Sequence, residues 1–366
     1  MQVPPAQLRQ ALVIASPHIY AEQLSLKTAR MFLGQDGINI SKLYSVEALD
    51  GLPPQADKWR AEGIDLVVAA GGDGTIGAAA THLAHSGLPL GILPLGTSND
   101  FARSLQIPME LSEACQTIAA GHSTRVDLGG AQPAAPAPYA LHQAALRDEG
   151  HLALANKTGA QAFFTHALTL GLNVAFAQLA TSAALRQVFG RFTYPIAAVE
   201  TLSTSQLYDF TLRFGDPACA LAPEETENDI EAGQPYHYQA LQVAVINSPI
   251  FGGQFEFSLA GVELHDHLLD ILIIERFDLR QLLAAAQMAF TPPVNGRREA
   301  ISRHFPGIQH VKARQVMIET AEPMDVTLDG ELRGRTPILV TSAERALKVI
   351  VPLASSIPAQ SGEAGG

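Results

Sequence analysis

A glycine-rich segment placed directly after a short apolar run constrains the fold of this chain more than any other feature. Residues 64–70 are apolar and rich in β-branched side chains, which is typical of a strand buried on both faces. Gly71-Gly72-Asp73-Gly74-Thr75 follows at the carboxyl end of that run. Its glycines permit backbone angles that other residues avoid and let main-chain N–H groups approach phosphate oxygens closely. An alanine-rich run at 77–85 predicts a following helix, whose N-terminus adds partial positive charge.

Asp73 is the unusual member of this segment, because a carboxylate repels phosphate unless a divalent cation lies between them. It therefore indicates Mg²⁺ and phosphoryl transfer. The alternative is that the glycine cluster is only a tight turn. A second loop, Thr97-Ser98-Asn99-Asp100, follows another strand-like run at 88–93 and favours the functional interpretation. Ligands of open α/β sheets bind outside the carboxyl ends of the strands, so we expect both loops to face one site.

Three segments together resemble the diacylglycerol kinase catalytic domain superfamily, which includes bacterial lipid kinases and sphingosine kinases. They are GGDGT at 71–75, PLGTSNDFAR at 94–103 and LDGE at 328–331, in the order of that family. The resemblance spans residues 10–352. It implies an α/β fold with an N-terminal doubly wound domain like that of NAD kinase and phosphofructokinase. A mainly antiparallel β-sandwich domain would follow, with the active site in the cleft between the two.

The resemblance also implies roles for particular residues. Glu331 matches the catalytic base that activates the lipid hydroxyl, and Asp73 and Asp100 match residues that hold Mg²⁺ directly or through water. The residues that the resemblance assigns to ATP are Ser45, Gly71, Gly72, Asp73, Gly74, Thr75, Thr97 and Asn99. Two structural alternatives stay open: Asp100 as the N-cap of a helix, and Glu331 as part of a hairpin, because Asp329-Gly330 is a strong turn signal.

The chain departs from the family at several positions. The family binds a structural Mg²⁺ at an Asp-Gly-Leu-Leu-Asp motif, which here reads Asp266-His267-Leu268-Leu269-Asp270. The match implies a second metal site at Asp266, Leu268 and Asp270, with solvated loop acids as the alternative. Gly77-Ala78 also stands where the family usually has Asn-Glu after GGDGT.

A length of 366 residues predicts two domains. We expect residues 1–127 to form the nucleotide-binding domain, with 335–353 returning to it, 128–334 to form the lipid-substrate domain, and 354–366 to be a disordered tail. Residues 20–33 favour a helix, and the Pro- and Ala-rich stretch at 129–140 favours a linker. Strands are predicted at 164–170, 209–214, 240–246, 268–274 and 316–320.

Composition excludes some partners and favours one compartment. A net charge of −12 argues against nucleic acid and against strong adhesion to anionic membranes. Two distant cysteines and no basic-then-apolar leader favour a reduced cytoplasmic setting. Residues 158–185 carry no Asp, Glu, Lys or Arg, but their polar side chains favour a strand followed by a helix over a membrane span.

These observations predict a cytoplasmic, ATP- and Mg²⁺-dependent kinase that phosphorylates a hydroxyl of diacylglycerol or a related lipid alcohol. Such an enzyme would contact the membrane surface transiently, and a homodimer is kept open. The first alternative is a catalytically degenerate nucleotide- or lipid-binding protein of the same fold. The second is a small-molecule kinase of the NAD kinase type.

Overall fold

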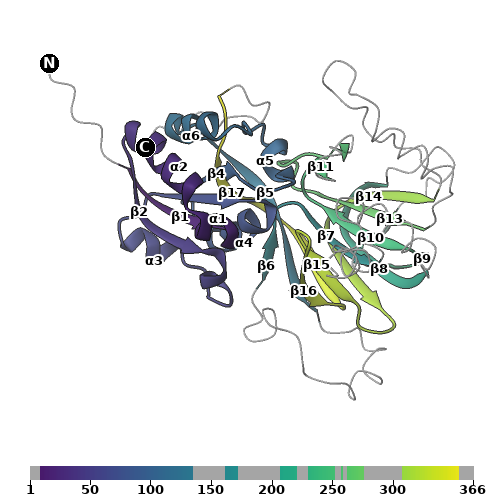
Figure 1. The fold of residues 1–366 in the computed structure, drawn as a ribbon. Coiled ribbons are helices and arrows are strands. Elements are labelled where there is room, and N and C mark those ends of the chain that lie inside the picture. The colour runs from purple at the N-terminus through teal and green to yellow at the C-terminus, as the bar shows by residue number, and fades with distance from the viewer. Residues whose placement is uncertain are drawn as a thin grey trace, which may run out of the picture.

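The computed structural model describes residues 9–134, 161–171, 207–220, 230–251, 257–258, 262–275 and 307–353 (Figure 1). The helix expected before residue 185 and the predicted tail at 354–366 lie outside these residues. The elements in chain order are β1 (Arg9–Ala15), α1 (Pro17–Glu22), α2 (Leu24–Gln35), β2 (Ile38–Ser45), η1 (Val46–Leu49), α3 (Ala56–Ala61), β3 (Leu66–Gly71), α4 (Asp73–Leu83), β4 (Leu90–Pro94), α5 (Asp100–Ser104), α6 (Leu111–Ala120), β5 (Ser123–Pro133), β6 (Ala162–Phe164), β7 (Ala167–Gly171), β8 (Tyr208–Ala220), β9 (Pro235–Ala240), β10 (Gln242–Ile246), β11 (Ile250–Phe251), β12 (Phe257–Ser258), β13 (Leu269–Ile274), β14 (Ile308–Thr320), β15 (Asp325–Leu328), β16 (Glu331–Arg335) and β17 (Ile338–Ile350).

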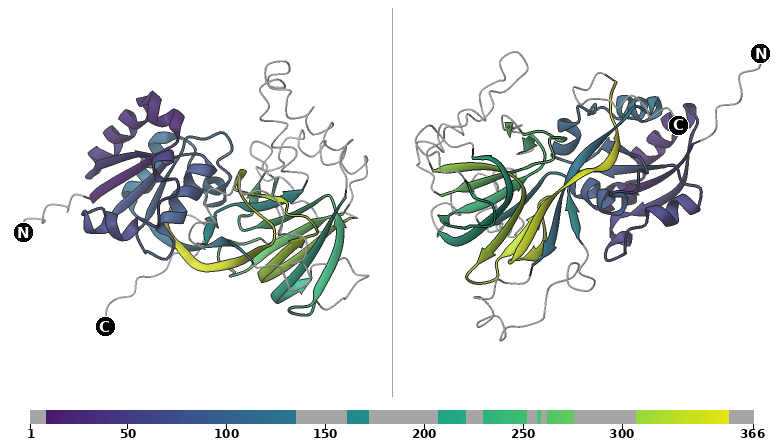
Figure 2. Two further views of the ribbon diagram at one scale, coloured as in Figure 1. Left: turned by 90° about the horizontal axis from the view of Figure 1, so that it is seen from below. Right: turned by 180° about the vertical axis from the view of Figure 1, so that it is seen from behind.

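The N-terminal body is the predicted doubly wound α/β unit. Its parallel strands run in the order β2-β1-β3-β4, and every residue of β3 is buried, as the continuous apolar run predicts. Helices flank these strands, with α2 packed against α6 and α4 packed against β3 (Figure 2). Strand β1 and the residues of β3 and β4 form the centre of its hydrophobic core.

The C-terminal body is mainly antiparallel, which confirms the second half of the predicted fold class. Strands β7, β10, β13 and β14 lie side by side, with the β15–β16 hairpin beyond β7 and the β8–β9 pair beside β14. A second core forms on one face, and alternate residues of β13 (Leu269, Ile271 and Ile273) point into it.

Strand β17 joins the two bodies into one sheet. It pairs with β14 and β5 in antiparallel fashion, and Val349 lies beside Leu90 of β4 in parallel fashion. Val340 belongs to the second core and Leu347 to the first, on either side of a bulge between Ala343 and Leu347. The chain segment predicted to return to the first body therefore contributes to both cores. The domain boundary after residue 127 stays a prediction, since β5 runs across it.

Part of the expected linker is a strand. Residues 129–133 belong to β5, where they pair with β17 and partly with β6, and Gly129 and Gly130 lie against side chains rather than in a turn. A Cβ atom on Gly129 would lie 2.0 Å from the ring of Phe164, and one on Gly130 would lie 1.9 Å from the amide of Gln161. Glycine serves close packing here, whereas the proline and alanine content of 129–140 had indicated a linker.

Two other expected elements are interrupted. The helix predicted over 20–33 is two helices, α1 and α2, divided at Gln23, whose φ of 57° is left-handed. The strand predicted over 164–170 is divided into β6 and β7 by a bend at Thr165 and His166. The backbone of that bend bonds to a side chain far away in the sequence, described below.

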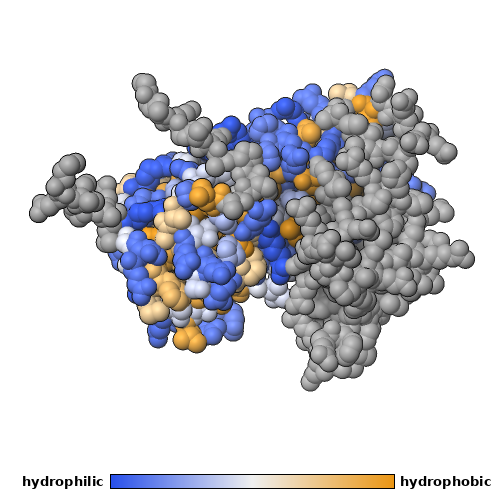
Figure 3. All heavy atoms as spheres, turned by 90° about the horizontal axis from the view of Figure 1, so that it is seen from above, coloured by the Kyte–Doolittle hydropathy of each residue, from blue (hydrophilic) through white to orange (hydrophobic). Residues whose placement is uncertain are grey.

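Apolar side chains on the surface are scattered. Figure 3 shows hydrophobic residues interspersed among hydrophilic ones on the N-terminal body. The large hydrophobic side chains that are exposed include Leu24, Met31, Leu52 and Leu332. Within the part of the chain that the structure describes, we find no helix with the length and hydropathy that a bilayer crossing requires.

Candidate active site

The carboxyl ends of the parallel strands meet at one edge of the sheet. Ala15 at the end of β1 pairs with Ser45 of β2 and Ala70 of β3, and Gly71 pairs with Pro94 of β4. The loops that leave these strands are therefore neighbours, and they carry most of the residues predicted to bind nucleotide. One of those residues, Ser45, has a buried hydroxyl without a hydrogen-bond partner among the described residues.

The two glycine-containing loops touch through their backbones. A Cβ atom on Gly96 would lie 2.3 Å from the Cα of Gly72, so the second loop does not tolerate a side chain at this crossing, and a Cβ atom on Gly72 would be tight at 3.2 Å from the Cα of Gly96. Gly71 is similarly close to Thr75, since its Cβ atom would lie 2.4 Å from the Thr75 hydroxyl oxygen. Helix α4 begins at Asp73 rather than at residue 77, with Gly72 as its N-cap. The glycines bring the first turn of α4 against the second loop.

Asp73 connects the two loops through its carboxylate. Its Oδ1 accepts a hydrogen bond from the backbone N–H of Phe101 at 2.9 Å, and its Oδ2 accepts one from that of Asp100 at 3.1 Å. These are the first N–H groups of α5, which is where a carboxylate stabilises a helix. Each oxygen keeps one further lone pair.

Asn99 shapes the second loop from within. It is buried in the left-handed conformation, with φ at 53°. Its Oδ1 accepts from the Gly96 N–H at 3.0 Å, and its Nδ2 donates to the carbonyl oxygens of Pro94 and Gly96 at 3.2 and 2.9 Å. Asn99 therefore occupies the N-cap position of α5, which was the alternative role for Asp100. Asp100 is instead the first residue of that helix. Thr97 is exposed on the outer side of this loop.

The hairpin that carries Glu331 lies against the first turns of α4. Asp329 and Gly330 both have positive φ, 48° and 86°, which is the tight turn that an Asp-Gly pair predicts. A Cβ atom on Gly74 would lie 2.9 Å from Oε1 of Glu331, and one on Gly77 would lie 2.6 Å from Oδ2 of Asp329. The structure thus brings Glu331 to the GGDGT loop, although the two are far apart in the sequence.

Asp329 anchors this hairpin to the bend between β6 and β7. Its Oδ2 accepts from the Thr165 N–H and hydroxyl at 2.9 and 3.0 Å, and its Oδ1 accepts from the N–H groups of His166 and Ala167 at 2.8 and 3.1 Å. Burial of the carboxylate raises the pKa of Asp329, whereas His166 and the backbone N–H groups act to lower it. Both carboxylate oxygens are engaged in two hydrogen bonds each, so Asp329 holds the turn.

Glu331 has one engaged oxygen and one that faces the loop. Its Oε2 is paired with Arg333, and Arg333 also lies 3.5 Å from Asp50 of the N-terminal body. Oε1 is the oxygen directed toward Gly74. Arg333 was not predicted from the sequence, because nothing in the motif marks a residue that bridges two distant segments.

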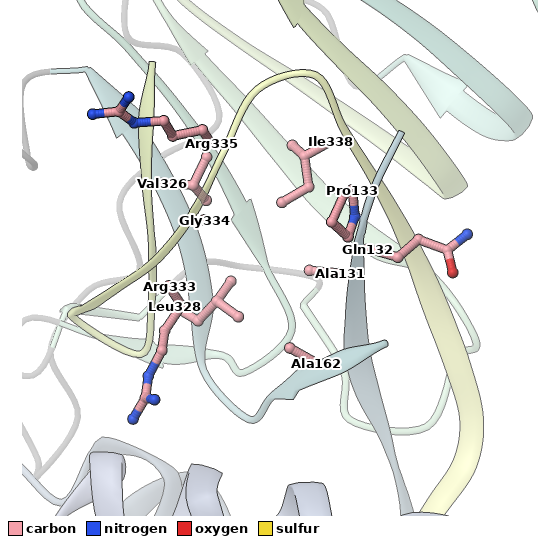
Figure 4. A pocket seen from close by; sticks show the side chains of 10 residues that line it. All are labelled: Ala131, Gln132, Pro133, Ala162, Val326, Leu328, Arg333, Gly334, Arg335 and Ile338. Atoms are coloured by element: carbon pink, nitrogen blue, oxygen red, sulfur yellow. The ribbon is translucent and has the colours of Figure 1, made fainter. Parts of the chain in front are cut away.

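An apolar hollow lies beside this hairpin (Figure 4). Ala131, Ala162, Leu328 and Ile338 line its centre, and Arg333 points away from it at the lower edge of the view. The hollow is formed where β5 and β6 face the β15–β16 hairpin.

The residues of the second expected metal site form a different cluster. Asp266 and Asp270 contact Lys312 and His310 rather than the phosphate loops. Among the residues whose placement the structure gives, no three or more His, Cys, Asp or Glu side chains converge as metal ligands would.

The geometry defines a class of protein with two parts, an N-terminal α/β unit and an antiparallel β unit. The glycine loops of the first lie next to a carboxylate of the second. Two family models match the chain. The diacylglycerol kinase catalytic domain covers residues 20–131, and the YegS C-terminal NAD kinase beta sandwich-like domain covers residues 167–351. The chain belongs to this diacylglycerol kinase family.

Named relatives agree with this membership, and solved structures share the fold. A diacylglycerol kinase of Staphylococcus aureus (strain bovine RF122 / ET3-1) is 24% identical over 348 residues, which cover 94% of this chain and 93% of the relative. A diacylglycerol kinase from Staphylococcus aureus (strain JH9) is 24% identical over 84% of this chain and 81% of its own. The crystal structure of a diacylglycerol kinase from Bacillus anthracis str. Sterne has a TM-score of 0.55 at 20% identity, covering 96% of this chain and 99% of the other. A second crystal structure from the same organism has a TM-score of 0.64 at 21% identity, covering 97% and 99%.

Proposed function

We propose that this protein is an ATP-dependent, Mg²⁺-assisted kinase that transfers the γ-phosphate to a hydroxyl of diacylglycerol or a related lipid alcohol. One observation carries the proposal: Oε1 of Glu331 faces Gly74 in the GGDGT loop. A base next to a phosphate-binding loop is the arrangement that phosphoryl transfer to an alcohol needs.

The residues at the loops suit a nucleotide and its metal ion. Backbone N–H groups of the glycine loops and the N-terminus of α4 favour phosphate, and the orphaned hydroxyl of Ser45 is a ready nucleotide contact. Asp73 keeps lone pairs for a hydrated Mg²⁺, and Asp100 lies beside it at the start of α5. When bound, Mg²⁺ would neutralise charge on the transferring phosphoryl group. Thr75 and Thr97 are proposed hydroxyl donors to the phosphates, and Asn99 acts by shaping its loop.

Within this proposal, Glu331 accepts the proton of the lipid hydroxyl through Oε1 while Arg333 orients the carboxylate through Oε2.

The proposed membrane contact is transient and lies near the same hairpin. Leu332 is 55% exposed next to Glu331, and Leu52 is 46% exposed near Asp50, the residue that Arg333 reaches. These two side chains would enter the lipid interface while the protein stays in the cytoplasm. A homodimer is a separate proposal, which light scattering of the purified protein would test.

The direct test is transfer of labelled phosphate from ATP with Mg²⁺ to diacylglycerol, sphingoid bases and other lipid alcohols, with NAD as a small-molecule acceptor. We expect transfer to at least one lipid and a loss of roughly 100-fold or more in Glu331→Gln. Glu344→Gln is the matched control, because Glu344 also pairs with an arginine, Arg314, away from the loops. Full activity of Glu331→Gln would contradict its role as the base.

Outcomes of the same assay decide between the alternatives. Nucleotide binding without transfer to any acceptor would favour the catalytically degenerate binding protein. That alternative rests on Gly77-Ala78, which replace the Asn-Glu of the family. Gly77, however, leaves the space that the side chain of Asp329 occupies, and this supports an intact active site. Transfer to NAD would favour the small-molecule kinase.

A further inference from the structure

One buried and one half-buried carboxylate are paired with a lysine and a histidine where β13 and β14 lie side by side. Asp270 of β13 is directly opposite Lys312 of β14, and His310 lies two residues before Lys312 on the same face of the sheet. The exposed fractions of the side chains are 1% for Asp270, 9% for His310, 12% for Lys312 and 19% for Asp266. Ionised carboxylates this deeply buried require a positive partner, since burial without one is costly.

The positive partner is part of the chain. The Nζ atom of Lys312 lies 2.6 Å from Oδ2 of Asp266 and 3.6 Å from Oδ1 of Asp270. His310 donates from Nε2 to the same Oδ1 of Asp270 at 2.6 Å. The ammonium therefore lies between the two aspartates of the expected metal site at Asp266, Leu268 and Asp270.

The remaining oxygens do not make a magnesium site. Oδ1 of Asp266 accepts the Leu268 N–H at 3.0 Å, so three of the four carboxylate oxygens are bonded to N–H groups. Only Oδ2 of Asp270 lacks a partner among the described residues. Mg²⁺ requires about six oxygen ligands in octahedral geometry, and an ammonium group in that space repels it.

The turn before β13 is also held without a metal ion. His267 stands where the family motif has glycine and takes a left-handed conformation, with φ at 63°. Its N–H donates to Oδ2 of Asp127 at 2.8 Å, and its ring nitrogen Nδ1 lies 3.2 Å from the same carboxylate. Asp127 also accepts the Arg345 N–H from the bulge of β17, so the turn is fixed to β5 and β17.

We propose that Lys312 is a built-in counter-ion for Asp266 and Asp270, and that this protein folds without the structural Mg²⁺ implied by its family's motif. The site belongs to the fold rather than to the reaction, so the proposal stands apart from the kinase function. The catalytic Mg²⁺ that accompanies ATP is a separate ion.

Thermal unfolding of the nucleotide-free protein, in EDTA and in MgCl₂, tests the proposal. We expect the wild type to unfold at the same temperature in both, and Lys312→Met to unfold several degrees lower in EDTA because Asp266 and the buried Asp270 lose their ammonium. Lys42→Met is the matched control, since it removes an ammonium from the exposed pair with Glu62. If Lys312→Met does not fold, the double variant Lys312→Met/Asp270→Asn should restore folding by removing the uncompensated charge.

Binding of Mn²⁺, followed by electron paramagnetic resonance, supplies a second readout. The Asp73→Asn variant removes the contribution of the phosphate loops, and we expect it to bind no Mn²⁺ at the β13–β14 cluster. Binding that persists in Asp73→Asn and disappears on adding Asp266→Asn would overturn the proposal. So would a wild-type unfolding temperature that Mg²⁺ raises and Asp266→Asn makes insensitive to Mg²⁺, or a Lys312→Met variant as stable in EDTA as the wild type.

Discussion

Asp329 and Glu331 are two residues apart in one hairpin, but their surroundings differ. Asp329 accepts four hydrogen bonds from residues 165–167, and Glu331 keeps one oxygen directed at Gly74. The first carboxylate fixes where the second one points. This division of roles depends on Gly77, because a side chain there would meet Asp329.

Gly77→Ala should therefore reduce turnover. Its Cβ atom would lie 2.6 Å from Oδ2 of Asp329, so the hairpin must move away from α4. Misplacement of the base by about 1 Å predicts a fall in kcat of about tenfold or more. The measurement is steady-state kinetics, with the KM for ATP expected to stay unchanged because the phosphate loops are untouched.

Gly34→Ala is the control for this change. Gly34 is also helical, and a Cβ atom there would have nothing within 4 Å. Alanine is favoured over glycine in helices by about 1 kcal/mol, so propensity alone would stabilise both variants. An unchanged kcat in Gly77→Ala would show that the hairpin does not need this close approach.

At the scale of elements, α4 links the phosphate loop to the packing behind it. It begins at Asp73, and near its end His82 is buried with its ring 5.8 Å from that of Trp59. Burial lowers the pKa of His82 from its ordinary 6.5, opposed by backbone carbonyls of Pro53 and Leu49. Protonation of His82 therefore favours the unfolded chain.

The stability that His82 contributes should be complete above its unfolded pKa of 6.5 and should decline as the pH falls through the lowered folded value. His82→Phe keeps a ring but removes the titration. Its free energy of unfolding should consequently fall less than that of the wild type between about pH 7.5 and about pH 5.5. Urea unfolding at both pH values measures this, with His18→Phe, at an exposed helix position, as the control. Equal pH dependence in wild type and His82→Phe would refute the assignment.

Elements defined by local patterns were predicted from the sequence, whereas elements shaped by distant contacts were not. The buried run of β3 and the alternation of β13 are local, and both strands are present. The bend at Thr165 and His166 is caused by Asp329, whose side chain is 163 residues from His166. Gly129 belongs to a strand that pairs with β17 and β6, and its contact with Phe164 is signalled by no neighbouring residue.

At the scale of the whole molecule, the candidate site is assembled from both bodies and opens near exposed apolar residues. Leu332 projects from the hairpin that carries the base. Leu332→Ser should reduce turnover several-fold on diacylglycerol in vesicles, because less apolar surface enters the interface. Turnover of a short-chain, water-soluble analogue should be unchanged, and the comparison of the two substrates is the measurement.

Leu24→Ser serves as the control, since Leu24 is 64% exposed at the start of α2. It should leave both activities intact. Equal losses on vesicles and on the soluble analogue in Leu332→Ser would place the effect in catalysis rather than in membrane contact.

The sequence predicted the motifs of the candidate site but not the ion pairs that join distant segments. Glu331 meets Gly74, as the order of the motifs implied, whereas the pairing of Arg333 with Asp50 and of Lys312 with Asp266 joins segments that carry no shared signal. Ion pairs between strands that are distant in the sequence depend on the register in which the strands pair. That register is fixed only when the whole sheet has formed, so it cannot be read from a local sequence pattern.

Strand β17 has a consequence for the order in which the molecule can be completed during translation. The phosphate loops are all synthesised before residue 134, but β4 and β5 gain β17 as a neighbour only after residues 338–350 have emerged. A nascent chain that stops short of β17 leaves Val340 absent from one core and Leu347 absent from the other. The N-terminal body thus contains the two glycine loops early, but its sheet is finished by a strand that is synthesised much later than they are.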